Sequence, residues 1–183
     1  MINRIHIFGA SGSGATTLGS TLSLLLPHVL FDGDDYFWKE KFNHMRERQE
    51  RVELLKEDLS NNQQWILSGA VCGWGDELKS LFDLVVFLYV PQDIRVNRLK
   101  EREFLRYGDE ILPGGSKNEQ SKAFLEWASL YDKAGMEVRS RLLHEQWMSG
   151  LSCPIVRIEG DHSVKERVDI VIYYLKSHTT LRK

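Results

Sequence analysis

Residues 9–17, GASGSGATT, decide the fold that we expect for this chain of 183 residues. Their spacing is that of the phosphate-binding motif G-x-x-x-x-G-K-[ST], except that Ala15 stands at the lysine position. An alternating apolar segment at residues 2–8 precedes the motif, and leucines at helical spacing follow at residues 16–26. Glycines let backbone N–H groups turn inward around phosphate oxygens, and a helix start adds the positive end of its dipole. The stretch therefore predicts a strand, a phosphate-binding loop and a helix.

Apolar strand-like segments and helical segments alternate along the rest of the chain. A capping pattern, Ser116-x-x-Glu119, predicts one long helical stretch towards Gly150, with Gly135 as a candidate break, and Ser163-x-x-Glu166 predicts the start of the last helix. The alternation predicts an α/β fold, a parallel sheet with helices on both faces and a ligand at the carboxyl ends of the strands. Further strands are expected at residues 29–31, 65–67, 84–90 and 155–158, and further helices at residues 47–59, 93–107 and 163–176.

The composition is that of an ordinary globular chain, and its length fits one domain over residues 1–183. A net charge of −2 argues against a nucleic acid polymer or an anionic membrane as partner. No apolar run reaches the roughly 20 residues that cross a bilayer, and no signal peptide is recognisable. Cys72 and Cys153 are far apart and form no CxxC pair, which favours a reducing, cytoplasmic location.

Residues of the glycine-rich loop are the candidates for binding the phosphates of ATP. The hydroxyl of Thr16 stands where it would ligate Mg²⁺. The structural alternative is a glycine-rich turn without a ligand. The candidate phosphate-binding residues are Gly9, Ser11, Gly12, Ser13, Gly14, Ala15, Thr16 and Thr17.

A second interpretation of the loop is an NAD(P)-binding oxidoreductase. Gly9-x-x-Gly12-x-x-Ala15 fits the glycine pattern of dinucleotide-binding dehydrogenases, and Asp32 lies where an acid would bind the ribose hydroxyls. Against it, the chain contains no Tyr-x-x-x-Lys pair, and the ending Gly14-x-Thr16-Thr17 suits a Mg²⁺-triphosphate better than a pyrophosphate diester.

The strand–GxxxxG-x-T-T–helix start, the Asp-x-Asp at residues 32–34, the Ser-Gly at residues 68–69 and the later Arg-rich helix resemble the adenylate-kinase and shikimate-kinase-like branch of P-loop kinases. More narrowly, GASGSGATTLG, FDGDDYFW, LSGAVCGWGD, LPGG and MEVRSRLLHEQW are similar to bacterial adenylate-kinase-like P-loop ATPase proteins that lack the P-loop lysine. This likeness spans nearly the whole chain.

The resemblance implies a three-layer P-loop NTPase fold with a five-stranded parallel sheet in the order 2-3-1-4-5 and a small lid at about residues 102–118. It implies ATP and Mg²⁺ as ligands. By analogy with the Asp-x-Asp of shikimate-kinase-like members, Asp32 would help to hold Mg²⁺ and Asp34 would bind the acceptor hydroxyl. Two departures are Ala15 and Ser68, the latter where many P-loop proteins carry an aspartate that organises Mg²⁺.

Arginines and aromatic residues supply the remaining candidates. Arg95, Arg98, Arg102 and Arg106 share one helical face, which is either a solvated basic face or a source of positive charge for the transferring phosphoryl group. With Asp34, we expect Arg102 and Arg106 to be catalytic. Candidates for binding the acceptor are Asp34, Tyr36, Trp38, Trp74 and Arg139, and candidates for binding adenine are Arg98, Gly160 and Asp161.

The sequence therefore favours an ATP-dependent phosphotransferase that acts on a small molecule or a nucleotide. A nucleotide-binding module with little or no catalysis is the first alternative, because Ala15 removes a charge that commonly contributes 10²–10³-fold or more to the rate. The oxidoreductase is the second.

Overall fold

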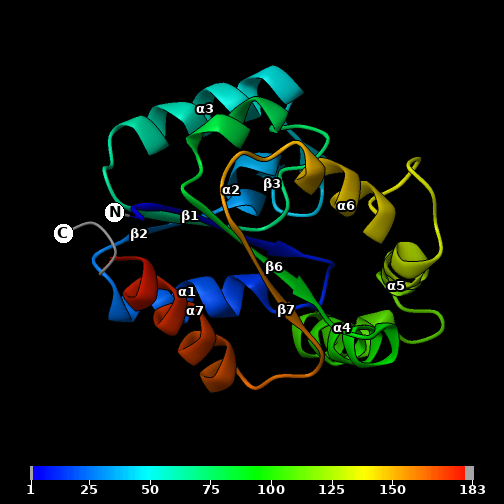
Figure 1. Ribbon diagram of the computed structural model, residues 1–183. Coiled ribbons are helices and arrows are strands. Elements are labelled where there is room, and N and C mark those ends of the chain that lie inside the picture. Colours follow the sequence, from blue (N-terminus) through cyan, green and yellow to red (C-terminus); the bar gives the residue numbers. More distant parts are fainter. Residues whose placement is uncertain (1, 180–183) are drawn as a thin grey trace.

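The computed structural model describes residues 2–179 and has a central sheet of five parallel strands (Figure 1). The sheet order is β2-β5-β1-β6-β7, so the strands follow the predicted order 2-3-1-4-5. The strands are β1 (Arg4–Gly9), β2 (Val29–Asp32), β5 (Trp65–Ser68), β6 (Leu84–Tyr89) and β7 (Ile155–Glu159).

Helices cover both faces of this sheet, with α3 and α6 on one side and α1 and α7 on the other (Figure 1). Short 3-10 helices occupy Asp76–Leu81, Gly108–Ile111 and Leu130–Asp132. The α-helices are α1 (Ala15–Leu25), α2 (Gly33–Phe37), α3 (Arg48–Ser60), α4 (Gln92–Tyr107), α5 (Asn118–Ser129), α6 (Arg141–Ser149) and α7 (Val164–Thr179). Within residues 2–179, no helix is both long and apolar enough to span a membrane.

Alternating side chains of β1 divide the core into two layers. Ile5 and Ile7 pack with Leu18 and Leu22 of α1, while Phe8 faces the opposite layer. Strand β6 is buried along nearly its whole length, as its continuous apolar run predicts for a strand covered on both faces. These layers fix the position of the loop that leaves β1 at its carboxyl end.

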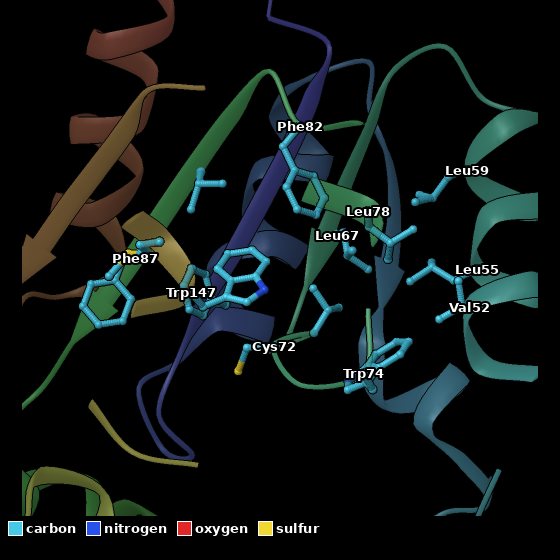
Figure 2. Packing of buried hydrophobic residues seen from close by; sticks show 14 of the residues in the cluster. Val52, Leu55, Leu59, Leu67, Cys72, Trp74, Leu78, Phe82, Phe87 and Trp147 are labelled. Atoms are coloured by element: carbon cyan, nitrogen blue, oxygen red, sulfur yellow. The ribbon is translucent and has the colours of Figure 1, made fainter. Parts of the chain in front are cut away.

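The second layer lies between α3, α6 and the sheet (Figure 2). Val52, Leu55 and Leu59 point from α3 towards the sheet, and Trp147 of α6 lies beside the strands. Trp74 also belongs to this core: it is 4% exposed and its indole N–H donates to the Ala70 carbonyl. Trp74, which the sequence predicts to bind the acceptor, thus packs in the same core cluster as the α3 residues and is outside the described lining of the candidate cavity.

Two predicted features of the helical region need correction. Ser116 does not cap α5; its hydroxyl donates to Glu110 at 2.6 Å, and the helix begins two residues later without a side-chain cap. The stretch towards Gly150 is also divided, because Ser140 caps a separate helix by accepting the Leu143 N–H. The capping box at Ser163 and Glu166 is confirmed.

A short antiparallel hairpin was not predicted. It consists of β3 (Trp38–Glu40) and β4 (His44–Met45) and follows α2 directly. Phe42 at its turn has a positive φ of 69°, which is unusual for a residue with a side chain. The hairpin places Trp38 and Phe42 near the loop that follows β1.

Candidate functional site

The loop between β1 and α1 has a backbone that only glycines allow. Gly12 has a φ of 80°, and a Cβ atom there would lie 2.7 Å from the Arg95 carbonyl oxygen. A Cβ atom on Gly9 would lie 2.3 Å from the Leu88 carbonyl oxygen. A single internal bond, from the Ser13 N–H to the Ala10 carbonyl at 3.0 Å, closes the turn. The glycine spacing of the sequence thus reflects close packing against β6 and α4.

The loop leaves donors free for a ligand. Among the hydrogen bonds of the described residues, neither the Gly12 N–H nor the Gly14 N–H donates to a backbone or side-chain acceptor. Gly14 also has a positive φ of 89° and precedes the first turn of α1. Free N–H groups at a helix start fit the oxygen atoms of a phosphate.

A cavity of about 610 Å³ opens beside this loop. The cavity brings together the predicted phosphate-binding residues, Gly9 and residues 11–17, with the predicted Asp34, Trp38, Arg98, Arg102, Arg106 and Arg139. Its other lining residues, which were not predicted from the sequence, are Ala10, Phe37, Phe42, Met45, Gly69, Ala70, Leu99, Glu103, Tyr107, Gln120, Phe124 and Trp127.

Asp34 and Asp32 do not face the same way. Asp34 lines the cavity, whereas Asp32 is outside its described lining and caps α2, where its Oδ1 accepts the Asp34 N–H at 3.1 Å. In an extended chain, residues two positions apart would share a side. Gly33–Phe37 is instead helical, so Asp34, Phe37 and Trp38 share the cavity face.

Burial raises the pKa of Asp32 above its ordinary value, and the nearby carboxylates of Asp34 and Asp35 raise it further. The hydrogen bond from the Asp34 N–H acts in the opposite direction and lowers this pKa. Tyr36 lies on the opposite face of α2, where its hydroxyl donates to Asp58 of α3 at 2.6 Å. Tyr36, which the sequence predicts to bind the acceptor, is therefore outside the described lining of the cavity.

Arginines give the cavity an excess of positive charge. Arg106 forms an ion pair with Glu103 at 3.5 Å and lies 4.3 Å from the centre of the Phe42 ring. Within residues 2–179, Arg102 and Arg139 have no carboxylate partner within 4.0 Å. Desolvation lowers the pKa of Arg102, and the neighbouring Arg106 lowers it further. The predicted pair Arg102 and Arg106 thus reaches the same cavity as the loop.

Aromatic rings hold these guanidinium groups in place. The Arg102 guanidinium lies 5.8 Å from the centre of the Phe124 ring, and that of Arg139 lies 5.7 Å from the centre of the Trp127 ring. Phe124 and Trp127 stack on each other, one turn apart on α5. In the sequence this spacing resembles an ordinary core-facing stripe, so it gave no signal of a cavity wall.

A smaller hollow of about 310 Å³ lies on the other side of the loop, against Gly12 and Gly14. Arg98 lines both spaces and forms an ion pair with Asp161, so two of the three predicted adenine residues lie together. Gly160 is outside the described lining; its N–H donates to the Tyr89 carbonyl at 2.9 Å in a turn with a φ of 109°.

Two buried arginines contact the loop from outside the cavity. Arg95 is fully buried, forms an ion pair with Asp132 at 2.9 Å and donates to the Val90 carbonyl, so it does not belong to a solvated basic face. Arg167 of α7 is 4% exposed and donates to the Ser13 carbonyl at 2.6 Å. Burial lowers the pKa of Arg167, and Arg98 lowers it further. No sequence pattern distinguished Arg167 from the other charged residues of its helix.

The donor set fits a hydrated Mg²⁺ that is shared with phosphates rather than an all-protein metal site. No group of three or more His, Cys, Asp or Glu residues that could hold a metal occurs in the described part of the chain. The Thr16 side chain is exposed to the cavity, and its hydroxyl makes no bond within residues 2–179. Mg²⁺ commonly keeps several waters and takes one or two protein oxygens plus phosphate oxygens.

Comparison with known proteins agrees with this geometry. Residues 5–121 match the family model described as an AAA domain. The chain belongs to the AAA domain family. The chain is also similar to YqaC of Bacillus subtilis (strain 168). The two proteins are 65% identical over 178 residues, which cover 97% of this chain and 100% of that protein.

Several solved structures with the same fold are kinases. A shikimate kinase from Acinetobacter baumannii, in complex with shikimate, has a TM-score of 0.59 and 18% identity, with 97% of this chain and 95% of that chain covered. A deoxyadenosine kinase from M. mycoides has a TM-score of 0.52 and 16% identity, with 95% of this chain and 99% of that chain covered. This member of the AAA domain family therefore has a P-loop kinase-like fold.

Proposed function

We propose that the protein is an ATP-dependent phosphotransferase whose acceptor, a small molecule or a nucleotide, binds in the 610 Å³ cavity. The observation that carries the proposal is that the free donors of the loop, the Asp34 carboxylate and the Arg102 guanidinium all line this one space. Phosphoryl transfer requires these three elements: a phosphate cradle, an acid beside the acceptor hydroxyl and positive charge for the spreading negative charge.

In this proposal the Gly12 and Gly14 N–H groups hold the phosphates of ATP, and the Thr16 hydroxyl contributes one ligand to Mg²⁺. Asp32, two positions before the cavity-lining Asp34, would help to hold the metal through a water molecule. A bound Mg²⁺ neutralises charge on the phosphates. The adenine occupies the smaller hollow beside Arg98.

Asp34 accepts the hydrogen bond of the acceptor hydroxyl and takes its proton as the new P–O bond forms and the bond to ADP breaks. Arg102 and Arg106 stabilise the negative charge that spreads over the equatorial oxygens. The lid of the proposal, at about residues 102–118, includes the end of α4 and the 3-10 helix Gly108–Ile111. Closure of this segment would exclude water from the reacting atoms. We also propose that the protein acts in the cytoplasm.

A nucleotide-binding module with little or no turnover is the second candidate, and Ala15 favours it. Both candidates keep the cradle; they differ in whether other cations replace the missing lysine.

A thermal-shift experiment followed by an ADP-release screen tests the proposal. Mg²⁺-ATP at a hundred times its Kd should stabilise the fold by about 2.7 kcal/mol, which is roughly 5–10 °C in Tm for a chain of this size. NAD⁺ should give no shift. A shift with NAD⁺ alone would overturn the proposal in favour of the oxidoreductase.

The screen then offers nucleosides, nucleotides, sugars and hydroxy acids as acceptors. ADP release that depends on one acceptor class supports the phosphotransferase. Binding of Mg²⁺-ATP without acceptor-dependent ADP release identifies the binding module instead.

A further inference from the structure

Two guanidinium groups contact the phosphate-binding loop from behind, on its carbonyl side. The Arg167 Nη1 donates to the Ser13 carbonyl at 2.6 Å, and the Arg95 Nη1 donates to the Ser11 carbonyl at 3.3 Å. The two side chains come from α7 and α4, and both are buried. Neither lines the larger cavity, in which Ala15 lies, whereas Arg167 lines the smaller hollow.

Each of these carbonyls shares a peptide unit with a free donor of the loop. The Ser13 carbonyl is bonded to the Gly14 nitrogen, and the Ser11 carbonyl is bonded to the Gly12 nitrogen. A cation that binds the oxygen of a peptide group draws electron density from it and makes its N–H a stronger donor. The N–H groups of Gly12 and Gly14, which are among the loop N–H groups without an acceptor in the described part of the chain, are therefore the ones that the arginines polarise.

The two arginines differ in how their charge is balanced. Arg95 is paired with Asp132 at 2.9 Å. Within residues 2–179, no carboxylate lies within 4.0 Å of the Arg167 guanidinium, and its Nε and Nη2 have no hydrogen-bond partner. A buried cation without an acid partner is costly, and an anion bound nearby reduces that cost. A Cβ atom on Gly14 would lie 2.9 Å from the Arg167 Nη1, so this charge lies directly behind the free Gly14 N–H.

We infer that Arg167 is a positioning residue that supplies positive charge to the polyphosphate of a bound nucleotide through the peptide group between Ser13 and Gly14. It thereby replaces part of the charge that Ala15 lacks. The inference rests on the proposed function in one respect, since the loop must hold nucleotide phosphates. The ligand group that it recognises is the diphosphate or triphosphate, not the nucleoside.

Equilibrium binding of ATP, ADP and adenosine to purified variants tests this role. Arg167→Gln removes the charge but keeps a donor for the Ser13 carbonyl, and Arg167→Lys keeps the charge. We expect Arg167→Gln to weaken ATP and ADP binding about five- to tenfold, as expected for a partly buried charge that acts through an aligned dipole, and to change adenosine binding less than twofold. Lys165→Gln is the matched control, because it removes one charge from an exposed position of the same helix. It should leave all three affinities unchanged.

A second substitution separates charge from loop support. Ala15→Lys should restore most of the ATP and ADP affinity of Arg167→Gln, and should increase the affinity of the unsubstituted protein by a smaller factor. Arg167→Lys should bind ATP within about threefold of the unsubstituted protein, the size of effect left when charge is kept but geometry changes. If Arg167→Gln does not fold, two other variants still test the inference: Ala15→Lys alone, which retains Arg167, and Arg167→Lys, which retains its charge.

An equal loss of adenosine and ATP affinity in Arg167→Gln would overturn the inference, because it would mean that Arg167 only supports the hollow. Failure of Ala15→Lys to restore phosphate affinity would overturn it too. If the unsubstituted protein binds neither ATP nor ADP, the proposed function fails instead, and the two failures are thus distinguishable.

Discussion

Replacing Arg102 with alanine should separate phosphoryl transfer from folding stability. The side chain has no carboxylate partner in the described part of the chain, so its removal leaves no buried acid behind. Its visible contact is with the Phe124 ring, 5.8 Å from the guanidinium carbon, and a cation–π contact at a partly exposed site contributes about 0.5–1 kcal/mol. The free energy of unfolding should therefore fall by no more than about 1 kcal/mol.

The effect on the rate should be far larger. If Arg102 stabilises the equatorial oxygens, its loss should lower kcat by about 10²-fold or more, the cost of removing one transition-state donor. That loss corresponds to about 2.7 kcal/mol of activation free energy, which exceeds the expected stability change. The affinity for Mg²⁺-ATP should change only a few-fold, because the loop supplies the ground-state contacts.

The assay is single-turnover hydrolysis of Mg²⁺-ATP, which needs no knowledge of the acceptor, together with urea denaturation and calorimetric ATP binding. Lys100→Ala is the control, since this exposed residue lies on the same helix outside the described cavity lining. Equal rates in Arg102→Ala and Lys100→Ala would refute the role. A stability loss of several kcal/mol would refute the structural premise.

The remaining predictions concern the acids of α2 and two buried histidines. Asp34→Asn should abolish acceptor-dependent ADP release and leave the ATP affinity within a few-fold of that of the unsubstituted protein. Asp32→Asn should weaken the Mg²⁺ dependence of the rate at little cost in stability, because asparagine also caps helices. Unchanged kinetics in both variants would contradict these roles. Burial lowers the pKa of His6 to about 4 and that of His144 to about 3, from 6.5, so below pH 6.5 the unfolded chain binds protons that the folded chain does not. Stability should be full above about pH 7 and fall by about 1.4 kcal/mol per histidine at pH 5.5, and urea midpoints that are equal at both pH values would contradict this.

The strands and the phosphate-binding loop were predictable from local patterns in the sequence, whereas the sheet order followed from the resemblance to P-loop kinases. Alternation in β1, the continuous apolar run of β6 and the glycine spacing each report a backbone environment directly. The single Ser163-x-x-Glu166 pattern likewise fixed the start of α7.

The walls of the site were less predictable, because they depend on orientation and on contacts distant in sequence. Whether Asp32 and Asp34 share a face depends on a helix of only five residues, too short for any periodic signal. Trp74 lies in the core because α3 covers it, and the sequence around it does not show this. Arg167 reaches the Ser13 carbonyl across 154 positions of chain, a contact that only the tertiary fold creates.

The contacts of Arg95 determine when, during synthesis of the chain, the phosphate-binding loop can reach its folded conformation. Its guanidinium joins the Ser11 carbonyl to Ala128 and Asp132, which lie beyond the end of the AAA domain match at residue 121. During synthesis, the glycine-rich sequence emerges first, but these partners follow more than a hundred residues later. Because such long loops must close before the contacts form, the nascent loop matures only when the distal helices have folded. The glycine-rich sequence is therefore necessary for the site but does not constitute it.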